Sequence, residues 1–181
     1  VAVSDTAIVD EDTSLTVDVI SNDTDVEGDT LTLTAATTDG SGTVSVNADG
    51  VSVDYTPAAN FNGPETITYT VSDGELSDTT GTLTITVTAV NDAPVAIADT
   101  ATVLEDSALT NIDIVSNDTD VEGDTLTLTA ATTDSNGTAT VNADGVSVDY
   151  TPAANFNGTE TITYIVSDGT DTSTGTLTIT V

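Results

Sequence analysis

The chain has 181 residues and is strongly acidic, because it contains 31 Asp and Glu residues, no Lys, Arg or His, and carries a formal net charge of −31. Since such a polyanion repels phosphates and anionic head groups, the composition excludes nucleic acid as a partner, argues against membrane insertion and favours cations as ligands. The chain has no Cys, so stabilisation beyond a small hydrophobic core must come from another source than disulfides, such as metal ions.

From the N-terminus onward, apolar residues alternate with Thr and Ser in short runs, and no helical period competes with this pattern. Alternation with a period of two is typical of strands that bury one face, and Thr and Ser suit the face in water. Clusters of Asn, Asp, Gly and Pro between the runs predict turns. The runs in the first half are Leu15–Val19, Leu31–Leu33, Val44–Val46, Val51–Tyr55, Ile67–Val71 and Leu83–Val87.

Three aromatic side chains stand out within this pattern. Phe61 follows a turn and is expected to close one end of the first domain by packing against its core. Tyr69 and Tyr164 alternate with aliphatic residues in a late run of each half, so we expect buried rings whose hydroxyl groups find hydrogen-bond partners.

The sequence repeats itself with a period of 94 to 95 residues, so that residues 1–87 align with residues 95–181. Some segments, such as Ser21–Asp39, recur without change. A period of this length indicates two complete domains rather than a solenoid. We therefore predict an all-β fold of two tandem immunoglobulin-like Greek-key sandwiches with about seven strands each, over residues 1–91 and 92–181.

Strand order assigns each loop to one end of its module. In the usual immunoglobulin order, loops 22–29 and 73–80 lie at the N-terminal pole, where the chain enters the module. The pair Glu11-Asp12 and the loop 60–65 lie at the C-terminal pole, where the chain leaves it. The connection Ala89–Pro94 is short, lacks Gly and contains a Pro that restricts the backbone, which indicates a semi-rigid joint.

Acidic residues are concentrated in the segment Asp23–Asp29, which recurs as Asp118–Asp124. Oxygen-bearing side chains at alternate positions, followed by Gly, are similar to the first half of an EF-hand calcium loop. The twelfth loop position is Thr34 instead of Glu, so the remaining oxygens must come from elsewhere. We predict a calcium site at the joint. The alternative is that these residues are turn formers whose carboxylates are simply solvated.

The expected calcium ligands form two groups. At the joint they are Glu11, Asp12, Asn91, Asp92, Asp118, Asp120 and Asp168. At the remaining loop positions they are Asp23, Asp25, Asp29, Asp73 and Asp124. Positions at an outer pole would need further oxygens from a neighbouring module, because calcium takes about six to eight of them.

Several motifs taken together resemble a known family. The segment Asn91–Pro94 is similar to the calcium-binding linker of cadherins, and Glu11-Asp12 and Asp118–Asp120 stand where cadherin repeats carry acidic ligands. With Tyr55–Gly63 and Ser72–Gly74, the pattern resembles the bacterial cadherin-like tandem repeats of large secreted, RTX-type adhesins over essentially the whole chain. The resemblance implies extracellular arrays, secreted or on the bacterial surface, that project a binding domain and are stiffened by calcium between neighbouring repeats.

Other functions fit the composition less well. Without His, Cys or Lys, only carboxylate pairs remain as general acid and base, and no apolar cleft is indicated for them, so we predict no enzyme. The rows Thr30–Thr34 and Thr84–Thr86 favour ice or flat glycan binding, which the twist of a sheet opposes. Self-association into a filament or surface layer and a polysaccharide-binding accessory role stay open as alternatives.

Overall fold

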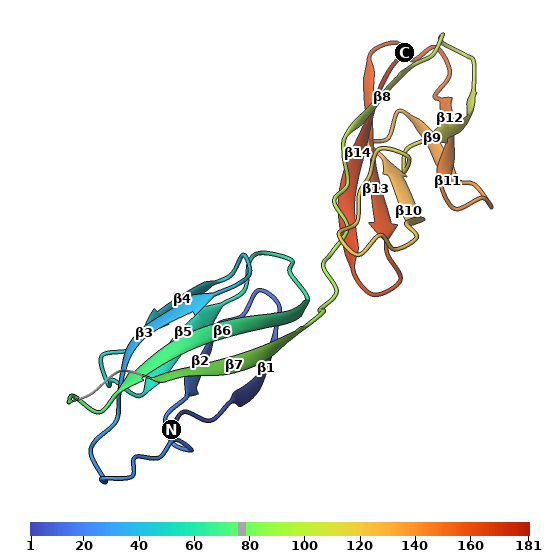
Figure 1. Ribbon diagram of the computed structural model, residues 1–181. Helices are drawn as coiled ribbons and strands as arrows, with labels where there is room; N and C mark the ends of the chain where they lie inside the picture. The colour runs from blue at the N-terminus through green and yellow to red at the C-terminus, as the bar shows by residue number, and fades with distance from the viewer. Residues whose placement is uncertain (76–78) are drawn as a thin grey trace. The chain divides into compact units, whose positions relative to one another are not determined.

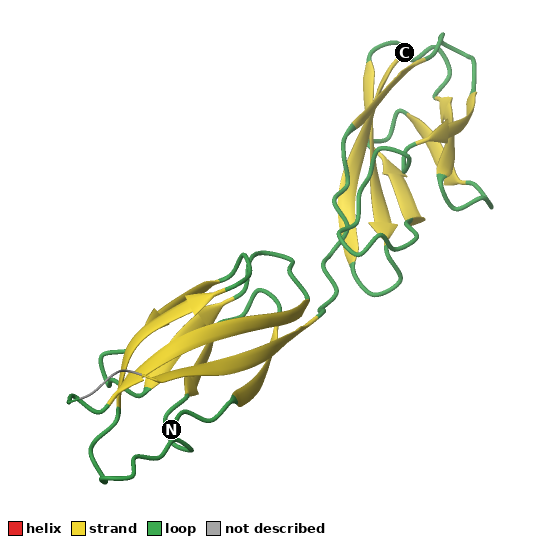
Figure 2. Cartoon of the chain, viewed as in Figure 1, coloured by secondary structure: helices red, strands yellow, loops and turns green. Residues whose placement is uncertain are grey.

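A computed structural model describes residues 1–75 and 79–181, so the centre of the predicted 73–80 loop lies outside the described residues. Within these ranges the secondary structure consists of strands and loops (Figures 1 and 2). The chain divides into two compact units, Val1–Val90 and Asn91–Val181. The predicted all-β fold with two sandwich domains is confirmed.

In the described part of the first unit, seven strands form two sheets (Figure 1). The strands are β1 (Asp5–Asp10), β2 (Leu15–Asp18), β3 (Thr32–Thr38), β4 (Thr43–Val46), β5 (Ser52–Thr56), β6 (Gly63–Ser72) and β7 (Thr79–Thr88). One sheet has the strand order β1-β7-β6-β3 and the other β2-β5-β4. Neighbouring strands are antiparallel except for β1 and β7, which are parallel.

The second unit repeats this architecture. Its strands are β8 (Asp99–Thr102), β9 (Leu109–Asp113), β10 (Thr127–Thr133), β11 (Gly137–Val141), β12 (Ser147–Pro152), β13 (Thr159–Ser167) and β14 (Thr172–Thr180). They form the sheets β10-β13-β14-β8 and β11-β12-β9. The sheet order matches that of the first unit strand for strand, as the internal sequence repeat predicts.

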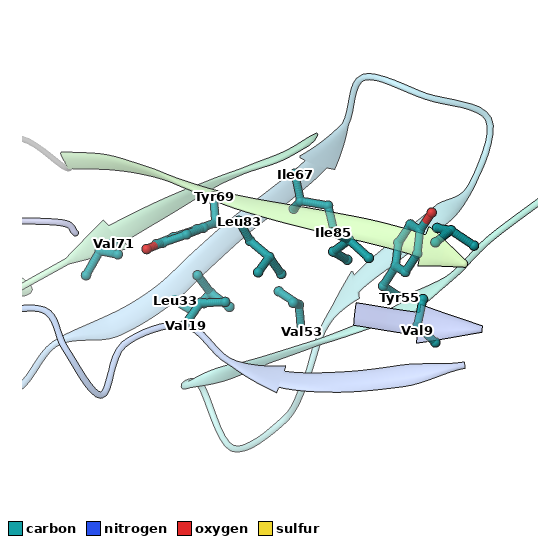
Figure 3. Packing of buried hydrophobic residues seen from close by; sticks show 11 residues of the cluster. Val9, Val19, Leu33, Val53, Tyr55, Ile67, Tyr69, Val71, Leu83 and Ile85 are labelled. Carbon is teal, nitrogen blue, oxygen red and sulfur yellow. The ribbon is translucent and has the colours of Figure 1, made fainter. Parts of the chain in front are cut away.

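Each core lies between the two sheets of its unit and is built from the inward-facing residues of the alternating runs. Figure 3 shows this packing in the first unit, where the fully buried residues are Val19, Val53, Tyr55, Ile67, Tyr69, Leu83 and Ile85. Their counterparts in the second unit are Ile114, Val148, Tyr150, Ile162, Tyr164, Leu177 and Ile179. Burying one large apolar side chain stabilises a domain by about 1.5 to 3 kcal/mol, so these residues carry the fold.

The strand β1 is the element that the alternation did not reveal. It is short on large apolar residues, since Ala7 and Val9 point toward the core while Ile8 is exposed. Its register with β7 runs from Asp5 opposite Leu83 to Asp10 opposite Thr88. This pairing places the beginning of β1 at the N-terminal pole and its end, next to Glu11, at the C-terminal pole.

The aromatic side chains lie as expected. Phe61 is partly buried and packs against the core of the first unit. Tyr69 and Tyr164 are fully buried, and each ring lies directly over a glycine of the adjacent strand, Gly81 and Gly175 respectively. A Cβ atom on either glycine would overlap the tyrosine ring, so the absence of a side chain there makes room for the ring.

Candidate functional site

The C-terminal pole of the first unit holds a carboxylate that is almost completely buried. Only 3% of the surface of Glu11 is exposed. Its Oε1 accepts a hydrogen bond from the backbone N–H of Val90 at 2.7 Å, and its own N–H donates to the carbonyl of Thr88 at 2.9 Å. Its Oε2 is buried and has no hydrogen-bond partner. The neighbouring Asp12 is exposed, and its Oδ1 accepts the N–H of Asn60 at 3.1 Å.

An unpartnered buried carboxylate oxygen is costly. Leaving such an acceptor unsatisfied costs about 1 to 3 kcal/mol, and more when it is charged. The usual remedy is a basic side chain, but this chain contains no Lys, Arg or His. The environment of Glu11 therefore fits a cation as the missing partner, and oxygen ligands of this kind suit calcium.

The N-terminal pole of the second unit contains two more such oxygens. The Oδ1 of Asp118 accepts the N–H of Ile97 at 2.7 Å and the hydroxyl of Tyr164 at 3.3 Å. The Oδ1 of Asp120 accepts the N–H of Asp124 at 2.9 Å. In both aspartates, Oδ2 is buried without a hydrogen-bond partner. Each carboxylate is thus fixed through one oxygen while the other remains without a donor.

Burial raises the pKa of two carboxyl groups at this pole, Asp118 and Asp99. Desolvation raises the pKa of Asp118, against the smaller lowering effect of the hydrogen bonds from Ile97 and Tyr164. Desolvation likewise raises the pKa of Asp99, and the nearby negative charge of Asp118 adds to that shift. A cation beside these carboxylates would favour their ionised forms and so act against both shifts.

Asn91, Asp92 and Asp168 also lie together in the second unit. The side-chain amide of Asn91 donates to Asp168 Oδ2 and to Asp171 Oδ2, both at 2.9 Å. This amide is the main reason why the pKa of Asp168 is lowered, and the N–H groups of its own loop contribute further. The backbone N–H of Asp92 donates to Glu122 Oε2 at 3.3 Å. Sequence reasoning missed Asp171 and Glu122, although both stand within the loops it singled out.

The predicted ligands at the N-terminal pole of the first unit are divided in their roles. Asp23 matches Asp118, since its Oδ1 accepts the N–H of Val3 at 2.7 Å and its Oδ2 is buried without a partner. Asp25 Oδ1 instead accepts the N–H groups of Glu27, Gly28 and Asp29 at 2.9 to 3.1 Å, which shapes the loop. The side chains of Asp29 and Asp124 are exposed.

Asp73 also takes part in the structure of its own loop. Its Oδ1 accepts the N–H of Glu75 at 2.9 Å. Across residues 1–75 and 79–181, no three acidic side chains come together in a cluster that could hold a metal ion.

The described residues were also compared with what a ligand pocket or a membrane span requires. These residues enclose no cavity of a size to hold a small ligand. Nor do they include a helix that is long and apolar enough to cross a membrane.

Comparison with known proteins identifies the family. The sequence matches the bacterial Ig domain family twice, over residues 1–86 and 91–180, and the chain belongs to this family. No curated protein sequence matches it. The sequence-based prediction of a bacterial immunoglobulin/cadherin-like tandem repeat is thereby confirmed.

Among solved structures, human protocadherin-24 EC1-2 (form II) covers 97% of this chain and 93% of its own length at 16% identity, with a TM-score of 0.58. The human desmocollin-1 ectodomain covers 98% of this chain and 39% of its own length at 14% identity, with a TM-score of 0.49. The endo-fucoidan hydrolase MfFcnA4 covers 99% of this chain and 27% of its own length at 24% identity, with a TM-score of 0.39.

The likeness to protocadherin-24 shows the fold and nothing finer, because the sequence identity is only 16%. The chain spans between 27% and 32% of the length of the fucoidan hydrolases that it matches. Bacterial Ig domains and cadherin ectodomains are typically extracellular and typically have no enzymatic activity of their own. The class of this chain is therefore a tandem of bacterial Ig domains with a cadherin-like fold.

Proposed function

We propose that this chain is a non-enzymatic spacer of an extracellular bacterial adhesin, in which calcium at the joint between the modules restricts bending. The observation that carries the proposal is Glu11, whose side chain is 3% exposed and whose Oε2 has no partner in a chain without any basic side chain. The unpartnered Oδ2 atoms of Asp118 and Asp120 support it independently in the other unit.

Seven residues would hold the ion. They are the ligands expected at the joint from the sequence, namely Glu11, Asp12, Asn91, Asp92, Asp118, Asp120 and Asp168. Calcium would supply the positive charge that these carboxylates lack. Carboxylates close to one another repel, so the protein without calcium would relieve that repulsion by moving the acidic loops apart. The joint would then bend more freely.

The expected strength of this effect follows from general values. Extracellular calcium modules bind with dissociation constants of about 10⁻⁴ to 10⁻³ M. Millimolar calcium is about one to ten times these constants, so each bound ion would add about 0.4 to 1.4 kcal/mol to the free energy of unfolding. A small domain has about 5 to 15 kcal/mol in all, so calcium would supply a measurable share of it.

The test compares the chain in millimolar calcium and in chelator at constant ionic strength. Thermal unfolding should shift to higher temperature with calcium, and small-angle scattering should change from a broad distribution of shapes to one extended shape. Equal melting temperature and equal scattering in both conditions would reject the calcium-stiffened spacer. A rise in molecular mass instead would favour self-association into a filament.

Glu11 offers a matched pair of variants for this test. Glu11→Gln keeps the size of the side chain and should remove most of the calcium-dependent shift in melting temperature. Glu105 occupies the corresponding position of the second unit, where its side chain is exposed. Glu105→Gln should therefore leave the shift unchanged, and an equal loss in both variants would show that overall charge, not this position, controls calcium binding.

A further inference from the structure

In both units, a buried tyrosine hydroxyl joins the last-but-one strand to the beginning of the first strand. Tyr69 shares its one hydroxyl hydrogen between the carbonyl of Val3 at 2.9 Å and Asp5 Oδ2 at 2.8 Å. Tyr164 contacts the carbonyl of Ile97 at 2.9 Å and Asp99 Oδ2 at 3.3 Å. The arrangement recurs because both the tyrosine and the aspartate are part of the repeat.

In each unit, an asparagine at the start of the acidic loop, residues 22–29 or 117–124, completes this arrangement. Asn22 donates its side-chain amide to Asp5 Oδ1 at 2.9 Å, and Asn117 donates to Asp99 Oδ1 at 3.1 Å. Both oxygens of each aspartate therefore have a donor. Asp99 differs in this respect from Asp118, whose Oδ2 has none.

The loop 117–124 is thereby tied to the beginning of the first strand of its unit at the predicted ligand and at the residue before it. Asn117, the residue before Asp118, is held by Asp99. Asp118 itself is held through Oδ1 by the N–H of Ile97 at 2.7 Å. The hydroxyl of Tyr164 lies 3.3 Å from the same oxygen and shares its one hydrogen among Asp118, Asp99 and the carbonyl of Ile97. These contacts restrict the rotation of the carboxylate and leave Oδ2 as the oxygen without a protein partner.

We propose that Tyr164, Asp99 and Asn117 are positioning residues that hold Asp118 with its Oδ2 directed to the calcium ion of the proposed function, on which this inference rests. A carboxylate that is already fixed loses little rotational freedom when it binds a cation, so its affinity is higher. In the first unit the arrangement is similar but not identical, because Asp23 Oδ1 accepts the N–H of Val3 and Asn22 is held by Asp5, while the hydroxyl of Tyr69 is directed to Val3 and Asp5.

The decisive variant is Tyr164→Phe, which removes the hydroxyl and keeps the ring over Gly175. Loss of one hydrogen bond of this kind should weaken calcium binding by about 3- to 10-fold. The readout is the midpoint of the calcium titration followed by the NMR amide signals of Asp118 and Asp120 in the whole chain. Asn117→Ala, at an exposed side chain, should weaken binding in the same direction without touching the core.

Tyr69→Phe is the matched control. It removes the same hydroxyl from the first unit, so it should lower the stability of the calcium-free protein about as much as Tyr164→Phe does. It should leave the calcium midpoint of Asp118 and Asp120 unchanged, because their loop is not among its hydrogen-bond partners.

Calcium binding and the positioning role can be refuted separately. A wild-type chain whose signals do not respond to calcium overturns both the proposed function and this inference. If the wild type binds calcium and Tyr164→Phe and Asn117→Ala bind it equally well, only the positioning role is overturned. An equal weakening by Tyr69→Phe and Tyr164→Phe would also overturn it, since the effect would then be a general loss of stability.

Discussion

The two modules have nearly the same sequence, yet they bury the same glutamate in different ways. Glu65 of the first module is 3% exposed and Glu160 of the second is fully buried. Glu65 accepts hydrogen bonds from the hydroxyl of Tyr55 at 2.7 Å, the N–H of Gly42 at 3.2 Å and the hydroxyl of Thr38. Three donors of three different strands or turns thus meet at one carboxylate.

In the second module these donors are directed elsewhere. The hydroxyl of Tyr150 donates to the carbonyl of Asn136 at 3.4 Å, and that of Thr133 donates to the carbonyl of Gly137 at 3.2 Å. Glu160 accepts the N–H of Asn136, at 3.3 Å on one oxygen and 3.2 Å on the other. The buried charge is therefore less well satisfied than in the first module.

The cause lies in the turn before the fourth strand of each module. Gly40 lies against Glu65, since a Cβ there would come within 2.5 Å of the glutamate Cδ. The second module has Ser135 at this position, and its backbone adopts a φ of 110°, which non-glycine residues rarely use. One side chain in an exposed turn thus changes the hydrogen bonding of a buried carboxylate.

The largest expected difference between the modules concerns the turn itself. Gly40→Ala should destabilise the first module by about 3 kcal/mol, because the new methyl group displaces a buried carboxylate from its donors. Ser135→Ala should be nearly neutral in the second module, where a Cβ is already present. Urea denaturation of the whole chain, followed by NMR signals from each module, measures both. Similar losses would refute the role of Gly40.

A smaller difference is expected at the glutamates. Glu65→Gln should cost about 2 kcal/mol, since the amide puts a donor where the site supplies only donors. Glu160→Gln should cost about 1 kcal/mol or less, because it also removes a poorly satisfied buried charge. The same denaturation experiment applies. If Glu160→Gln were the more harmful of the two, the ranking of the two networks would be wrong.

Ser135→Gly should remove part of the difference between the modules. Glycine adopts a φ of 110° without strain, although it also gives the unfolded chain more freedom. The net expectation is a gain of about 0.5 to 1 kcal/mol in the second module. The measurement is the urea midpoint of that module, and Ser41→Gly in the first module is the control that should give no gain.

The smallest effect is expected where the two modules agree. The Ser52 hydroxyl and the N–H of Val51 lower the pKa of Asp49, and Ser147 and Val146 do the same for Asp144. A lowered pKa stabilises the fold above the ordinary value of 3.8 and loses that effect as the pH falls further. NMR titration should give both carboxylates a pKa below 3.8. Asp49→Asn and Asp144→Asn should weaken the modules equally, and only above that pH.

The fold was predictable because it follows from local patterns. Alternating runs gave the strands on which the core residues lie, and the repeat gave two domains. β1 was missed because Ala7 and Val9 give a weak alternation, and its place is fixed by pairing with β7. The predicted calcium ligands at the poles stay predictions. Which oxygens lack a partner, as in Glu11 and Asp118, depends on distant contacts that no local pattern encodes.

The parallel pairing of the first and last strands also determines how a module responds to force. Because the chain enters at one pole and leaves at the other, tension on its ends pulls β1 and β7 past each other along their length. The hydrogen bonds between them are then loaded in shear and must break together, which resists pulling far better than opening one after another. This pairing runs over six residues in the first module, Asp5–Asp10, and over four in the second, Asp99–Thr102. Under tension the second module should therefore unfold at a lower force than the first. An array of such domains would then contain modules of different mechanical stability.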